Sequence, residues 1–218
     1  MDLAYATHQA SRLVEEPKVE HEEAVIWIGK YIHGSIGNGM ILYPMNNEGL
    51  EVYVNADFAG NWDPTDTENR DTVRSRHGFN ITYQGMQVSC KSQLQNEIAL
   101  STTESEYTGL SYALRDAIPL MSLLNEMKEK GIAVRTNATK IRCKVFEDNK
   151  GALEIAREKK YRPRTKHFNI RLHPFRSYVD SGDVTIHDID TTDQLADLLT
   201  KPLNEPGVKR HRLVLMGW

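Results

Sequence analysis

One long helix pattern in the middle of the chain limits the folds that are available to it. Ser101 with Glu104, and Thr103 with Glu106, offer two registers of a capping box, which is typical of a helix start. The pattern is expected to end near Gly131. Between these points apolar residues recur at helical spacing and form one face, made of Leu110, Ala113, Leu114, Ala117, Met121 and Leu124. That face must be covered, and the flanking segments carry strand patterns that can cover it.

Strand patterns lie both before and after this helix. Before it, a strand is predicted over 50–54 and a hairpin over 79–83 and 86–91, turning at Gln84 and Gly85. After it, the expected elements are a strand over 140–146, a helix over 151–157, a helix over 166–178, a strand over 184–189 and a helix over 192–200. Three strands followed by alternating helices and strands predict an α/β protein with a mixed sheet and helices packed on it.

The residues before 48 carry two shorter helix patterns. One runs from Tyr5 to Leu13 and the other from His21 to Gly34. A chain of 218 residues has room for one full domain and an appendage. We therefore predict a short helical segment over 1–47 and a single domain over 48–218.

Composition excludes several classes of protein. Hydrophobic residues make up 39% of the chain and charged residues 26%, as in ordinary globular proteins. No apolar run approaches the roughly 18 residues that span a membrane, and the N-terminus carries no leader pattern. Two cysteines are too few for a disulfide framework or a four-ligand zinc site. We therefore expect an intracellular, reducing location, in which the sequons at Asn80 and Asn137 are not glycosylated.

Four carboxylates stand where an element begins or ends. Asp57 follows the first strand, and Asp148 ends the fourth. Glu106 lies in the first turn of the long helix, and Asp197 lies in the last helix. Each alone has an ordinary explanation as a turn residue or as a complement to the helix dipole. Brought together at one end of a sheet, they would repel one another unless divalent cations neutralised them, and Mg²⁺ prefers such oxygen ligands. Two-metal hydrolysis of phosphodiesters uses a cluster of this kind.

A basic segment follows the fourth strand. Between positions 157 and 176 the chain has eight basic residues and one acidic residue. Those of interest here are Arg157, Lys159, Lys160, Arg162, Arg164, Lys166 and Arg171. This basic stripe can neutralise the phosphates of a nucleic acid, and a solvated helix face is the alternative explanation.

Five blocks of the sequence occur in a specific order. They are YVNADFAG at 53–60, ALSTTESEY at 99–107, EDNKGA at 147–152, RTKHFNIR at 164–171 and DQLADLLTKPL at 193–203. Together they resemble the ribonuclease H domain of copia-type LTR retrotransposon Pol polyproteins. Upstream, YATHQ at 5–9 and HEEAV at 21–25 resemble the thumb or connection segment that joins reverse transcriptase to this domain. The resemblance covers essentially the whole chain.

The resemblance implies a ribonuclease H-like fold, with a mixed five-stranded sheet flanked by helices. It implies hydrolysis of the RNA strand of RNA–DNA hybrids during reverse transcription, with two Mg²⁺ ions for which Mn²⁺ can substitute. The implied partners are the hybrid and the reverse transcriptase domain of the same polyprotein, in a cytoplasmic particle or the nucleus and without a membrane. In this context the basic stripe is expected to contact the hybrid backbone, since sequence is not read.

The same resemblance implies the site residues. Its catalytic positions fall on Asn55, Glu106, Asp148 and Asp197, and these four with Asp57 are the implied metal ligands. Glu104 corresponds to a helix cap rather than to the catalytic Glu. In the last block Asp193 remains the alternative to Asp197.

Asn55 departs from the family pattern, which usually has Asp at this position. An amide offers one neutral oxygen where a carboxylate offers two anionic ones, so two Mg²⁺ ions should be held poorly. Asp57, two residues on, is expected on the same face of the strand and can partly substitute. We therefore predict an impaired nuclease. The alternative is a catalytically inactive nucleic-acid-binding or interaction domain, and a transposase or integrase is disfavoured because the blocks at 99–107 and 193–203 match the ribonuclease group.

Overall fold

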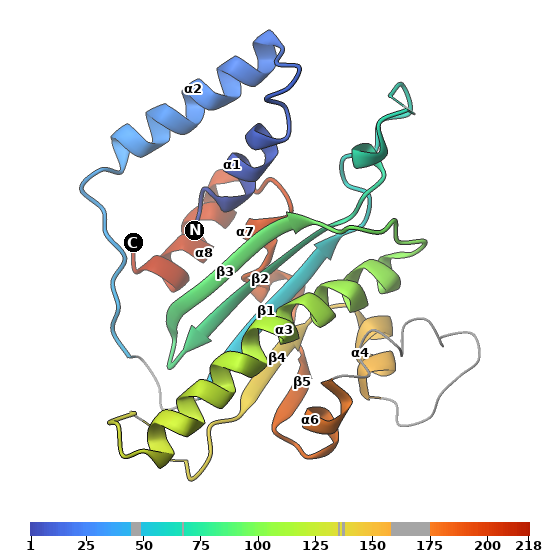
Figure 1. Ribbon diagram of the computed structural model, residues 1–218. Helices are drawn as coiled ribbons and strands as arrows, with labels where there is room; N and C mark the ends of the chain where they lie inside the picture. Colours follow the sequence, from blue (N-terminus) through green and yellow to red (C-terminus); the bar gives the residue numbers. More distant parts are fainter. Residues whose placement is uncertain (45–48, 67, 135, 137, 158–174) are drawn as a thin grey trace.

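The computed structural model describes residues 1–44, 49–66, 68–134, 136, 138–157 and 175–218. Its centre is a five-stranded sheet in the order β3-β2-β1-β4-β5. The strands are β1 (Leu50–Asp57), β2 (Arg76–Tyr83), β3 (Met86–Leu94), β4 (Cys143–Glu147) and β5 (Val184–Asp188). β1 pairs antiparallel with β2 and parallel with β4, so the sheet is mixed, as predicted (Figure 1).

The hairpin between β2 and β3 turns where it was predicted to turn. Gln84 has a φ of 54° and Gly85 a φ of 80°. Two successive positive φ angles define the turn type whose twist suits a two-residue hairpin. The pairing of β2 with β3 is therefore set by local turn chemistry.

The long helix α3 (Thr102–Glu129) begins at one of the two predicted capping registers. The Ser101 hydroxyl accepts a hydrogen bond from the Glu104 backbone at 3.1 Å, and Oε2 of Glu104 accepts one from the Leu100 backbone at 2.8 Å. Glu104 is therefore a cap, and Glu106 is free to face inward. The apolar face of α3 packs on β1 and β2 and buries the residues predicted from their spacing, with Leu124 at its edge.

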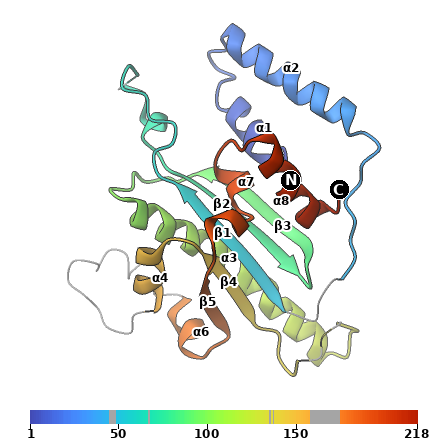
Figure 2. The same cartoon turned by 180° about the vertical axis from the view of Figure 1, so that it is seen from behind.

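Helices cover both faces of the sheet. On one face lie α3, α4 (Lys150–Arg157) and α6 (Arg176–Asp180). On the other lie α1 (Ala4–Ser11), α7 (Asp197–Thr200) and α8 (Glu205–Met216). Figure 1 shows α3 in front of the sheet, and Figure 2 shows α7 and α8 in front of it. β1 therefore runs between two helical layers, and each layer has its own apolar cluster.

The first N-terminal helix, α1, packs near β3, and one buried arginine joins it to the sheet by hydrogen bonds. Arg76 of β2 is 1% exposed, and its guanidinium donates to Gln9 of α1 at 2.5 Å and to Ser92 of β3 at 3.1 Å. The second helix, α2 (Val19–Gly34), contacts α1 and stands away from the sheet (Figure 1). The predicted boundary between 47 and 48 falls at residues outside the described part of the chain, and it stays a prediction.

The C-terminal region corrects two sequence predictions. The helix expected over 192–200 is wrong in extent: a 3-10 turn (Thr191–Asp193) precedes α7, which begins only at Asp197. α8 was missed, although Asn204 caps it by accepting a hydrogen bond from the Gly207 backbone at 2.9 Å and Gly217 ends it with a φ of 87°. Of the helix predicted over 166–178, residues 166–174 lie outside the described ranges, and α6 begins at Arg176. No helix in the described part of the chain combines the length and the apolar character needed to cross a membrane.

Candidate metal centre

The carboxyl ends of β1 and β4 meet at one edge of the sheet, because the two strands are parallel neighbours. β1 brings Asn55 and Asp57, and β4 brings Glu147 with Asp148 directly after it. Open sheets commonly place ligands at this position, outside the carboxyl ends of their strands. α3 supplies Glu106 from one face, and α7 supplies Asp197 from the other.

On the α3 side, three carboxylates form a compact cluster. Glu106, Glu147 and Asp148 each offer one oxygen, and these oxygens all lie within 4.8 Å of one another. Glu106 accepts a hydrogen bond from the Ala56 backbone. Glu147 accepts one through Oε1 from the Asn149 backbone at 3.1 Å. We call these three side chains the acidic cluster.

Two oxygens of the acidic cluster have no hydrogen-bond partner among the described residues. They are Oε2 of Glu106 and Oε2 of Glu147, and both are buried. Glu106 is 6% exposed and Glu147 is fully buried. By contrast, Asp148 is half-buried and accepts a hydrogen bond from the Thr191 hydroxyl at 2.9 Å. An unpartnered buried carboxylate oxygen is costly, so these two oxygens call for a proton or a cation.

The electrostatics of the acidic cluster agree with that requirement. Burial raises the pKa of Glu106 well above its usual value, and repulsion from Glu147 and Asp148 raises it further. Burial also raises the pKa of Glu147 to about 8, with a hydrogen bond from Asn149 opposing the shift. Desolvation and like charges both disfavour the ionised form, and both effects act here.

On the α7 side, the arrangement is different. The Asn55 amide donates to Oδ1 of Asp197 at 2.8 Å and to the Thr200 hydroxyl at 2.7 Å. Lys201 forms an ion pair with Oδ2 of Asp197 at 2.8 Å. Burial raises the pKa of Asp197, and Lys201 opposes that shift. Both oxygens of Asp197 therefore have partners, and we call Asn55, Asp197, Thr200 and Lys201 the amide group.

The structure thus brings together the four positions inferred from the sequence, in two parts. Glu106 and Asp148 lie in the acidic cluster, while Asn55 and Asp197 lie in the amide group. Repulsion from Asp148 contributes to the raised pKa of Asp197, so the two parts are close enough to interact. Asp193 lies elsewhere: it is exposed and pairs with Arg210.

Asp57 lies on the α7 side, as the alternation along the strand predicted. Its side chain packs on the turn after β1, where a Cβ added at Gly60 would lie 1.6 Å from Oδ2 of Asp57. Burial raises the pKa of Asp57, and the positive charges of Lys201 and Arg76 oppose the shift. Asp57 is therefore held by the turn rather than by the acidic cluster.

Glu147 was missed from the sequence, although a signal for it was present. Cys143, Val145 and Glu147 alternate along β4 and are all buried against the α3 side. A charged residue at the inward position of a strand is uncommon unless it is paired or functional. The neighbouring Asp148 matches the family block, and the ligand role was therefore predicted for Asp148 and not for Glu147.

The basic stripe is described only at its ends. Arg157 donates through Nε and Nη2 to the Ile186 carbonyl at 3.1 and 2.6 Å, which ties α4 to β5. The other members proposed for nucleic-acid contact lie outside the described residues; they are Lys159, Lys160, Arg162, Arg164, Lys166 and Arg171. Arg157 thus has a structural contact, and the binding role of the stripe stays a prediction.

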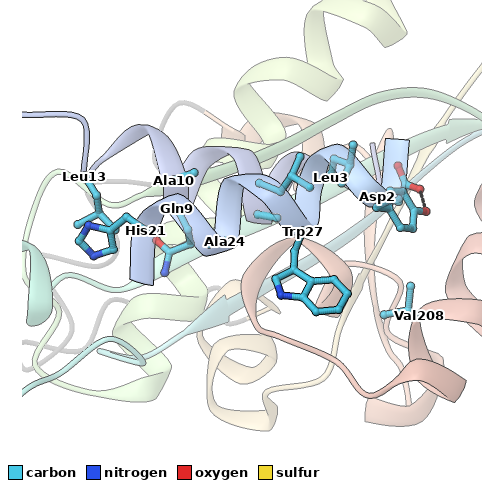
Figure 3. Close-up of a pocket in the computed structure, with 12 residues that line it drawn as sticks. Asp2, Leu3, Gln9, Ala10, Leu13, His21, Ala24, Trp27 and Val208 are labelled. Atoms are coloured by element: carbon cyan, nitrogen blue, oxygen red, sulfur yellow. Dashed lines mark hydrogen bonds between the residues drawn. The ribbon is translucent and has the colours of Figure 1, made fainter. Parts of the chain in front are cut away.

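A separate cavity of about 430 Å³ lies between α1 and α2 (Figure 3). Its lining is mostly apolar, with Leu3, Ala24 and Trp27 among its walls. The carboxylate of Asp2 at its rim accepts a hydrogen bond from the Tyr31 hydroxyl. His21 lies at the opposite end of the cavity from Asp2, so the titratable side chains that line it are not gathered at one point (Figure 3), and the strand-end site is the better candidate for chemistry.

Comparison with known proteins gives a consistent picture. No protein-family model matches the chain. It is 34% identical over 200 residues to the retrovirus-related Pol polyprotein from transposon TNT 1-94 of Nicotiana tabacum, a match that covers 92% of this chain. It is 33% identical over 204 residues to the Pol polyprotein from transposon RE1 of Arabidopsis thaliana, covering 93% of this chain. The chain is a homologue of retrovirus-related Pol polyproteins from plant transposons.

This Pol homologue corresponds to a small part of those proteins, spanning 14% of the tobacco polyprotein and 13% of the Arabidopsis one. Among solved structures it is similar to LC11-RNase H1, isolated from compost, with a TM-score of 0.48 and 15% identity. That match covers 75% of this chain and 97% of the other. The predicted α/β architecture is confirmed, with its mixed five-stranded sheet, flanking helices and preceding N-terminal helices.

Proposed function

We propose that this chain is a metal-dependent ribonuclease H-type endonuclease domain of a copia-type retrotransposon, acting on the RNA strand of RNA–DNA hybrids. The observation that carries the proposal is the convergence of Glu106, Asp148 and Asp197 at the ends of β1 and β4. These residues come from elements far apart in the sequence, within a homologue of Pol polyproteins. Carboxylates gathered at one point suit phosphodiester hydrolysis assisted by divalent metal ions.

The residues present fit a divalent metal. The donor set is all oxygen, which Mg²⁺ and Mn²⁺ accept, and two of its buried oxygens have no protein partner in the described structure. Glu106 and Asp148 would hold the metal, with Asp197 and Asp57 as further carboxylates nearby. When bound, the metal activates a water for attack and stabilises the leaving oxygen.

The orientation of the side chains around the site determines how well it can bind metal and support cleavage. Glu106 and Asp148 orient toward one point, and Asp197 is directed away from that role by its bonds to Asn55 and Lys201. The Asn55 amide presents hydrogen-bond donors to Asp197, where an aspartate would present another anionic oxygen. We therefore propose that cleavage by this chain is impaired.

The hydrogen bonds of the Asn55 side chain also favour a second function. Because Asn55 and Lys201 satisfy Asp197 without a metal, the fold can persist as a nucleic-acid-binding domain without catalysis. The partners that we propose are the RNA–DNA hybrid and the reverse transcriptase domain of the same polyprotein. Support for the latter comes from the Pol relatives and from apolar side chains of α2 that are exposed, such as Trp27 at 67%.

The test is cleavage of a labelled RNA–DNA hybrid in Mg²⁺ and in Mn²⁺. We expect slow, metal-dependent cleavage by the unmodified chain and at least about a hundredfold faster cleavage by Asn55→Asp, the scale of one electrostatic contact to a reacting centre. Asp148→Asn in the Asn55→Asp background is the control and should abolish the gain. Hybrid binding with no cleavage by either Asn55 form would favour the non-catalytic function.

A further inference from the structure

We propose that the acidic cluster is a binding site for a single divalent cation, in which Glu147 supplies the anionic oxygen that Asn55 lacks. The inference rests on the proposed function only for the class of metal. The ligand set is Glu106, Glu147 and Asp148, and it lies on the α3 side of the sheet. Asp197 and Asn55 are not part of it.

The first argument is geometric. Three carboxylate oxygens within 4.8 Å of one another come from α3, from the last residue of β4 and from the residue after it. Two ligands on opposite sides of an ion lie about 4.1 Å apart for Mg²⁺ and about 5 Å apart for Ca²⁺, twice the ion–oxygen distance. Separations of up to 4.8 Å fall within the span for Ca²⁺ and exceed the span for Mg²⁺ by at most about 0.7 Å, so side-chain movements of that size would bring the oxygens around one ion.

The second argument comes from the unpartnered oxygens. Oε2 of Glu147 belongs to a fully buried side chain, and Oε2 of Glu106 to one that is 6% exposed. Neither oxygen has a hydrogen-bond donor in the described part of the chain. A buried carboxylate oxygen without a donor costs free energy unless a cation or a shared proton completes it. The orphaned oxygens belong to two of the three proposed ligands.

The third argument is charge, and it limits the site to one ion. The acidic cluster has three carboxylates and no basic partner within hydrogen-bond distance in the described structure, so a divalent cation removes most of its repulsion. The amide group already has Lys201 on Asp197 at 2.8 Å. A second divalent cation there would face this ammonium group and the donors of Asn55. The proposed site is therefore a single-ion site on the α3 side of the sheet. Glu147 does not restore a second ion beside Asn55 and Asp197.

The experiment counts bound ions directly, by the electron paramagnetic resonance signal of free Mn²⁺ during titration of the full chain. We expect one tight Mn²⁺ ion per chain. Glu147→Gln, which keeps the shape of the side chain, should weaken its binding at least tenfold. Asp193→Asn is the matched control, since Asp193 is an exposed acid paired with Arg210, and should bind Mn²⁺ like the unmodified chain.

Three results would overturn the proposal: no tight Mn²⁺ ion, two equivalent ions, or unchanged affinity in Glu147→Gln. Circular dichroism and a melting curve in EDTA establish that Glu147→Gln is folded. Asp148→Asn gives a second check on the ligand set, because retained tight binding in that variant would also overturn it. The readout is independent of cleavage: a chain that binds one Mn²⁺ ion but never cleaves hybrid would contradict the proposed function and leave this site standing.

Discussion

The acidic cluster and the amide group lie at the same end of the sheet, yet they differ in how their buried carboxylates are neutralised. In the amide group, Asn55 and Lys201 donate to the Asp197 carboxylate, so its charge is met by donors within the chain. In the acidic cluster, Glu106 and Glu147 each keep a buried oxygen without a donor among the described residues. One side is complete without a ligand, and the other is complete only with a proton or a cation.

The difference shows what an amide does in place of a carboxylate. Asn55 removes a negative charge and adds two donors, so it stabilises the protein without metal at the expense of metal binding. A cost of this kind is expected at sites where function and stability oppose each other. Changing Asn55 and Glu147 separately should therefore move stability in opposite directions.

The largest expected effect is on the metal-free stability of Asn55→Asp. The change replaces the donor to Asp197 by an anion in a buried position, where Asn55 is 5% exposed. Loss of a hydrogen bond to a charged group and the new repulsion should together cost about 3 kcal/mol in the free energy of unfolding. Urea denaturation in EDTA measures this value.

Asn55→Ala is the control for that measurement, because it removes the donated hydrogen bonds without adding charge. Millimolar Mg²⁺ should stabilise both variants through the acidic cluster, by ligand linkage, and should stabilise Asn55→Asp by more, because its added carboxylate gains a neighbouring cation. If Asn55→Asp in EDTA is as stable as the unmodified chain, the proposed opposition between Asn55 and Asp197 is wrong.

The next effect is a dependence of metal-free stability on pH. The pKa of Glu147 is raised to about 8 in the folded state, so the folded protein holds a proton that the unfolded chain releases near its ordinary value of 4.5. The associated stability is present below about pH 4.5 and is lost as the pH rises through about 8. The slope can reach about 1.4 kcal/mol per pH unit for one proton.

The best window for this measurement is pH 6.5 to 8. Burial lowers the pKa of His77 to about 3, so its contribution to stability changes mainly below pH 6.5 and has the opposite sign. In EDTA, the free energy of unfolding should fall across this window in the unmodified chain and much less in Glu147→Gln. An identical slope in both proteins would assign the pH dependence to Glu106, whose pKa burial also raises, and would contradict a contribution from Glu147.

The fold was largely predictable because its signals are local. The Ser101 cap, the Gln84–Gly85 turn and the alternation along β1 act within a few residues. The length of α7 was overestimated, because the pattern over 192–200 does not show that Asp190 caps a separate 3-10 turn before it. α8 was missed although its cap and its terminal glycine are visible in the sequence.

The convergence of Asn55, Glu106, Asp148 and Asp197 at one edge of the sheet was predicted, but its division into two parts was not. The catalytic and metal-binding roles of these residues stay predictions. The orientation of the Asn55 amide depends on Asp197, which lies 142 positions away, and on Thr200 and Lys201 beside it. No local pattern reports such a contact. Glu147 carried a visible signal, but its importance depends on Glu106 of α3 reaching the same point, which only the folded chain brings about.

The smallest expected effect is that of changing Asp57, which lies on the α7 side with Asn55. This change tests whether a carboxylate on that side binds metal because of its position alone. Its side chain packs on the turn at Gly60 and faces the charges of Lys201 and Arg76. In the Asn55→Asp background, Asp57→Asn should lower hybrid cleavage by less than about tenfold, or about 1.4 kcal/mol, whereas Asp148→Asn should lower it at least about a hundredfold. Initial rates in Mg²⁺ give both values. If the unmodified chain already cleaves at an enzyme-like rate and Asp57→Asn abolishes that activity, Asp57 is the ligand from β1, and the α7 side holds a metal despite Asn55.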